Sequence, residues 1–151
     1  DIDTPGEVEV SEAVDYQGVS LARQNFEGFS FENSVMKEVD LSLAILVNAN
    51  LSRVDAREGT FTRTKAFSAD FSYSNISHAH FDHADMSSAN LLSANCSDTN
   101  FTNANFQNAD LTDANFTGAD VRWADFNGAR FHNTTWIDGR IIDSSTETLS
   151  S

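Results

Sequence analysis

An apolar residue recurs at every fifth position along this chain. These residues stand at numbers ending in 1 or 6 from Tyr16 to Ile141, which makes twenty-six consecutive units. Two positions earlier each unit carries a small residue, mostly Ala, and only Gln24 and Phe29 break this rule. The residue just before the apolar one is usually Asp or Asn, types that favour tight turns. A period of five fits neither the 3.6-residue helix nor the two-residue strand, so the pattern indicates an internal repeat.

The repeating unit resembles the A(D/N)LXX unit of the pentapeptide-repeat family. The match is closest at Ala109-Asp110-Leu111 and Ala114-Asn115-Phe116, and the resemblance covers residues 14–142. It implies an all-β fold, a right-handed quadrilateral parallel β-helix of about six to seven coils with four pentapeptides in each. Residues twenty apart would then stack in columns, and the stacked Phe side chains would form the core.

Short segments flank this single repeat domain. Residues 1–13 are predicted to be an N-terminal cap that covers the open end of the β-helix, or else an acidic tail. Residues 143–151 are predicted to be a flexible C-terminal tail. Trp136 is expected to cover the other end of the core, and Cys96, at a central position, is expected to be a buried hydrophobic residue.

Several apolar residues occupy positions that the repeat should turn outward. Leu43, Ile45 and Val47 do so within one coil, where contiguous exposed apolar surface would indicate an interface. The alternative is that the N-terminal segment folds back over them. Trp123, with Arg122 beside it, adds a residue type that is enriched at protein interfaces. The predicted interaction surface therefore comprises six residues: Leu43, Ile45, Val47, Trp123, Ile137 and Ile142.

The charge of the chain restricts the classes of partner. The net charge is −14, of which residues 1–15, with six acids and no base, contribute −6. Direct binding to nucleic acid or insertion into a membrane is not expected, because phosphate contacts need clustered Lys and Arg and no apolar run is long enough to span a bilayer. His78, His80 and His83 match no standard zinc spacing and are predicted to be surface residues. No catalytic constellation or cofactor motif is present, so no enzyme activity, metal or cofactor is predicted.

The sequence thus favours a non-catalytic structural or protein-interaction module, which binds an unidentified protein or a second copy of itself. The alternative follows from the resemblance, because the quinolone-resistance branch of the family forms dimeric rods that mimic DNA and occupy topoisomerases such as DNA gyrase. An acidic rod suits such mimicry, but the bases between residues 16 and 135 interrupt it. The sequence leaves the compartment open between the cytoplasm and a lumenal or periplasmic space.

Overall fold

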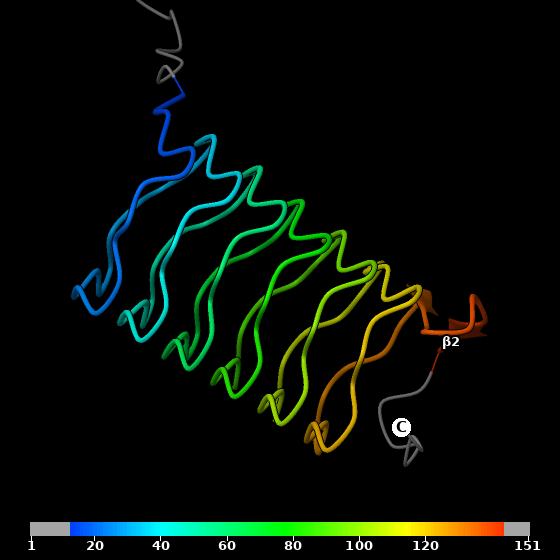
Figure 1. Ribbon diagram of the computed structural model, residues 1–151. Helices are drawn as coiled ribbons and strands as arrows, with labels where there is room; N and C mark the ends of the chain where they lie inside the picture. Colours follow the sequence, from blue (N-terminus) through cyan, green and yellow to red (C-terminus); the bar gives the residue numbers. More distant parts are fainter. Residues whose placement is uncertain (1–12, 144–151) are drawn as a thin grey trace, which may run out of the picture.

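The structure, a computed structural model, describes residues 13–143, which wind into a stack of similar coils that together form a rod (Figure 1). Residues at every fifth position pair in parallel with the residue twenty positions later, from Asp15 with Val35 to Asn115 with Thr135. Twenty residues therefore make one coil, and four pairings join each coil to the next. This confirms the predicted parallel β-solenoid. The predicted N-terminal cap and C-terminal tail lie almost wholly outside the described residues.

Each corner of a coil is a tight turn. The turn closes with a hydrogen bond from the small residue to the preceding large one, as from the Ala44 N–H to the Leu41 carbonyl at 3.1 Å. The third residue of every turn has a positive φ, at every fifth position from Gly18 to Asn133. This is the geometry of a type II turn. The left-handed conformation costs a residue other than glycine roughly 1 kcal/mol, and Asn and Asp tolerate it best.

The Asp and Asn residues that precede the large residues stabilise these turns. Their side-chain oxygens accept the backbone N–H two positions on, as Asn50 does from Ser52 at 2.9 Å and Asp70 does from Ser72 at 2.9 Å. The Ser52 hydroxyl donates to the same Asn50 oxygen at 2.6 Å. The predicted turn chemistry is therefore confirmed.

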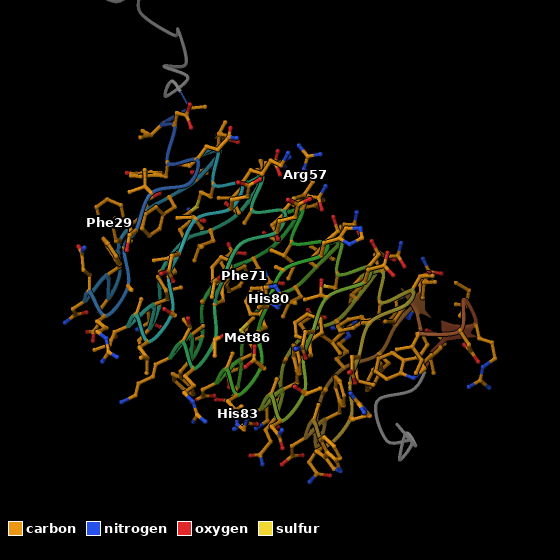
Figure 2. The ribbon with its side chains drawn as sticks, viewed as in Figure 1. Phe29, Arg57, Phe71, His80, His83 and Met86 are labelled. Atoms are coloured by element: carbon orange, nitrogen blue, oxygen red, sulfur yellow. The ribbon has the colours of Figure 1, made fainter. Side chains whose placement is uncertain are left out.

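Stacked aromatic rings fill the core. The rings of Phe61, Phe81 and Phe101 are fully buried in one column, with centroid distances of 4.4 Å and 5.5 Å between successive rings. Figure 2 shows Phe71 and Met86 in the interior of the coils. Cys96 is also buried, as predicted, and burial raises the pKa of its thiol well above the usual range.

The N-terminal end of the core is less covered than its middle. Phe29 occupies a position meant for a small residue, and its ring packs at the end of the rod against the rings of Phe26 and Phe31 (Figure 2). Phe29 is exposed, as are Val14 and Val19 in the same coil. Within the described residues, the first coil therefore presents apolar surface at its outer side.

A short antiparallel hairpin of β1 (Thr134–Thr135) and β2 (Ile141–Ile142) ends the described chain at the opposite end of the rod (Figure 1). Its loop closes with hydrogen bonds from the Trp136 N–H to the Arg140 carbonyl at 2.7 Å and from the Gly139 N–H to the Trp136 carbonyl at 3.0 Å. Gly139 has a φ of 88°. Such a three-residue loop with a left-handed glycine forms a bulge, and the bulge adds one residue to the repeat.

The extra residue shifts the inward and outward positions that follow it. Ile142 was expected to face outward, but its side chain is buried, with only 9% exposed, whereas Ile141, expected in the core, is 60% exposed. Both expectations are wrong, because they assume that the five-residue period continues unchanged through the hairpin. The dipeptide Asp138-Gly139 is the signal that predicts such a turn. Trp136 does cover the core as predicted, since it is 2% exposed and its ring packs against Phe116 at 5.3 Å.

Candidate interaction surface

Leu43 combines an exposed apolar side chain with an unfavourable backbone conformation. It is the third residue of a corner turn, with a φ of 60°, and 41% of it is exposed. Glycine or asparagine would be less strained at this position, and the packing of the core does not require a leucine there. The positive φ recurs at every corner turn and belongs to the fold, so it is the exposed apolar side chain that makes Leu43 a candidate contact residue.

The side of the rod next to Leu43 continues the apolar surface. Ile45 and Val47 are half-buried, and Phe67 is 46% exposed. Ile45 and Val47 belong to one coil, and Phe67 follows Val47 by twenty residues, which places it at the same position of the next coil. We call Leu43, Ile45, Val47 and Phe67 the side patch. The sequence analysis missed Phe67, although an apolar residue directly after the small centre Ala66 was a visible departure from the pattern.

Basic side chains surround the side patch. Ile45 pairs in parallel with Lys65, and Arg23 and Arg63 occupy the corner position of Leu43 in the coils before and after it. Among residues 13–143, none of these three cations takes part in an ion pair. Lys65 also pairs in parallel with Asp85 of the following coil. The patch therefore combines apolar surface with cations that form no ion pair within the described part of the chain, whose full sequence has a net charge of −14.

Trp123 lies at the same corner position as Leu43, four coils further along the rod. It has a φ of 62° and is 70% exposed, as predicted. The Arg122 guanidinium lies 5.3 Å from the centroid of its ring and also pairs with Asp120 at 2.7 Å. The hydrogen bond from Arg122 lowers the pKa of Asp120 below its usual value. The exposed indole of Trp123 and the Arg122 guanidinium therefore lie side by side on this corner.

The remaining predicted contact residues belong to the C-terminal hairpin. Ile137 is half-buried and packs against the core, and Ile142 is buried. The structure therefore separates them from the side patch, both by distance along the rod and by burial. Only Leu43, Ile45 and Val47 of the six predicted residues lie together.

The three neighbouring histidines lie on separate parts of the coil. His78, His80 and His83 are all exposed, as predicted, and His83 projects from the lower edge of the rod in Figure 2. His78 approaches Asp98 of the next coil at 3.6 Å. Within residues 13–143, no group of three or more His, Cys, Asp and Glu side chains is arranged to share a metal ion.

Other ionic contacts are local and solvated. The Arg57 guanidinium pairs with Asp55 at 2.8 Å at the outer edge of the rod (Figure 2), and this contact lowers the pKa of Asp55. Both side chains are partly exposed, so the pair contributes little to stability. The described part of the chain contains no helix that is long and apolar enough to cross a membrane.

The fold and the repeat together define the class of protein, a β-helical solenoid built from pentapeptides. The family model for pentapeptide repeats matches the chain in eight copies over residues 17–53, 67–95 and 94–133. The chain therefore belongs to the pentapeptide-repeat family, whose members are right-handed β-helices. Among curated proteins, none shows significant similarity to the sequence.

Two solved structures illustrate the relationship. The pentapeptide-repeat protein Rfr23 of the cyanobacterium Cyanothece 51142 is 27% identical, with a TM-score of 0.58, and the match covers 82% of this chain and 88% of Rfr23. A trypsin-treated form of QnrB1, a plasmid-mediated fluoroquinolone resistance protein, is 20% identical, with a TM-score of 0.67 over 81% of this chain and 70% of QnrB1. At 20% identity, the second match shows a common fold alone.

Proposed function

We propose that this chain is a non-catalytic protein-interaction module, a rod of about six to seven coils that binds a protein partner through the side patch. The observation that carries the proposal is that Leu43 and Phe67 expose apolar side chains on neighbouring coils, next to Ile45 and Val47.

The patch also indicates the chemistry of the partner. A matching protein surface would place apolar side chains against Leu43 and Phe67 and carboxylates beside Arg63 and Lys65. Such electrostatic complementarity gives specificity and speeds association. Trp123 lies about 19 Å further along the same corner, at about 4.8 Å per coil, and would contact a partner that extends along the rod.

The proposal is tested by affinity capture from an extract of the source organism. The bait is compared with a Leu43→Ser, Phe67→Ser variant and with a Tyr73→Ser control. Tyr73 is also exposed and has a φ of 59°, but it lies thirty residues after Leu43, one and a half coils, and therefore on the opposite corner. We expect one protein to bind the parent and the control but not the patch variant. Equal capture by all three baits would refute the side patch as the binding surface.

A second copy of the chain is the other possible occupant. Light scattering after size-exclusion chromatography separates the two cases. If the parent is a dimer and the Leu43→Ser, Phe67→Ser variant is a monomer, the side patch is a self-association surface and not a site for a different protein.

DNA mimicry is the alternative that the sequence left open, and the eight bases among residues 16–135, which interrupt the acidic faces, weigh against it. Residues 16–135 contain fourteen acids. Seven of them accept a backbone N–H two positions on and thus serve the turns: Asp40, Asp55, Asp70, Asp85, Asp110, Asp120 and Asp125. Half of the acidity of the rod therefore has a structural explanation. A DNA gyrase supercoiling assay distinguishes the two functions, because a mimic must inhibit the enzyme and an unrelated interaction module need not.

A further inference from the structure

The side patch lies near the end of the rod from which the N-terminal segment emerges. Its residues belong to the coils that follow the first one, because Ile45 pairs directly with Asn25 of the first coil and with Lys65 of the third. In the second and third coils, the side of the rod that holds Ile45, together with the corner turn just before it, presents six of its residues around the patch: Leu43, Ile45, Val47, Arg63, Lys65 and Phe67. This set contains two cations and no carboxylate, and Asp85 of the next coil pairs in parallel with Lys65. In the first coil, Arg23 occupies the position of Leu43 and adds a third cation. Glu27 of the same coil occupies the position of Val47 and places a carboxylate there.

The segment that precedes the described residues has the complementary composition. Residues 1–12 read DIDTPGEVEVSE, with five acids and no base. The stretch Glu7-Val8-Glu9-Val10 alternates acidic and apolar side chains, as a half-buried extended strand does. An extended strand sends alternate side chains to opposite faces. Its valines would therefore meet an apolar surface while its glutamates stay at the margin, where the cations lie.

We propose that residues 1–12 dock on the side patch, with their apolar side chains against Leu43, Ile45 and Phe67 and their carboxylates beside Arg23, Arg63 and Lys65. The consequence rests on the proposed function. If the side patch is the partner-binding surface, the segment competes with the partner and the chain regulates its own binding site. A partner of the same chemistry, an extended strand of alternating acidic and apolar residues, would displace it.

The segment is long enough to reach the patch. Twelve extended residues span about 40 Å at about 3.3 Å per residue. In a coil of twenty residues, Phe67 lies six positions around the perimeter from Ala13, which corresponds to at most about 20 Å. It also lies 54 residues further along the chain, or 2.7 coils, which adds about 13 Å along the axis. The direct distance is therefore at most about 24 Å, well within the span.

The open end of the core is the competing site for the same segment, and its charge disfavours docking there. Val14, Val19 and Phe29 are exposed at that end. The first coil carries the acids Asp15, Glu27 and Glu32 and a single base, Arg23. An acidic segment laid over this end would meet like charge, whereas the side patch offers cations without ion-pair partners among the described residues.

Docking is tested in the full chain by paramagnetic relaxation. A nitroxide label is attached to a Thr4→Cys variant, because Thr4 carries no charge and the buried Cys96 thiol, whose pKa is raised, is expected to stay unlabelled in the folded chain. We expect the label to broaden the amide signals of Ile45, Lys65 and Phe67. The amides of Thr135 and Arg140, in the hairpin at the opposite end of the rod, serve as the internal control and should keep their intensity.

Charge reversal provides the decisive comparison. Arg63→Glu with Lys65→Glu should abolish the broadening, and a further change of Glu7→Lys with Glu9→Lys should restore it. Arg63 and Lys65 are exposed, so these variants are expected to fold, which circular dichroism checks. Broadening confined to residues 14–30 would assign the segment to the end of the core and overturn the proposal. Broadening that survives charge reversal would also overturn it.

A capture experiment tests the competition separately. Glu7→Lys with Glu9→Lys in the otherwise unchanged chain should increase the amount of partner retained, because the competing segment no longer binds. If the label shows docking but capture does not increase, the regulatory consequence is wrong. Because the relaxation experiment needs no partner, failure of docking can be told apart from failure of the proposed function.

Discussion

Replacement of Phe81 by alanine tests the stacked core directly. Phe81 is fully buried, and its ring lies between those of Phe61 at 4.4 Å and Phe101 at 5.5 Å, with Phe71 edge-on at 5.8 Å. Truncation of a buried Phe costs about 3 to 5 kcal/mol, and each aromatic pair contributes about 0.5 to 1.5 kcal/mol beyond its buried area. We therefore expect Phe81→Ala to lower the free energy of unfolding by about 4 to 5 kcal/mol.

Two further variants make this prediction specific. Phe81→Leu should cost about 2 to 3 kcal/mol, less than Phe81→Ala, because leucine keeps most of the buried volume and loses the three ring contacts. Phe67→Ala should cost about 1 kcal/mol, because its ring is about half exposed and solvent fills the space left behind. Urea denaturation followed by circular dichroism measures all three. If Phe81→Ala costs no more than Phe67→Ala, the argument from a packed Phe column is refuted.

Three other predictions concern local features of the chain. Gly139→Ala should lower the free energy of unfolding by about 1 kcal/mol and Gly139→Asn by less, because the hairpin needs a left-handed residue; equal urea midpoints for the two variants would contradict this. Hydrogen bonds from Gln107 and a backbone N–H lower the pKa of Asp125, so its contribution to stability is present above pH 3.8 and is lost as the pH falls through the lowered value. Asp125→Asn should therefore flatten the loss of thermal stability below about pH 4, whereas an unchanged acid limb would exclude this contribution. Finally, the buried Cys96 thiol should react with maleimide only when urea unfolds the chain, and rapid labelling of the native protein would show that the core is open.

The regular part of the fold was predictable because each unit repeats the same local chemistry. An Asp or Asn before the large residue stabilises the turn, and the small residue allows neighbouring sides of the coil to approach. Twenty residues per coil then place equivalent residues in contact. The turn residue, the small residue and the coil length agree with one another in every coil. The spacing of the Phe residues in the sequence therefore predicts the column of Phe rings.

The candidate site was predicted only in part. Leu43, Ile45 and Val47 stand out as apolar residues at outward positions of one coil. Phe67 lies twenty residues after Val47, so the predicted coil length places it in the same column, and the structure adds that its side chain stays exposed. The strain at Leu43 was also hidden, because φ cannot be read from the position of a residue in the repeat without the turn type.

The sequence by itself determined the period, the family resemblance, the inward and outward positions and the composition of the core, because these follow from a local pattern that recurs without interruption to Trp136. The tertiary structure decided what depends on contacts between coils and on where the pattern ends. It left the side chains of Leu43 and Phe67 exposed, placed around them cations that form no ion pair among the described residues, and turned Ile142 inward through a hairpin that adds one residue. The physical reason is that a repeat specifies each unit, whereas a surface arises from neighbouring coils and an end arises where the repeat stops.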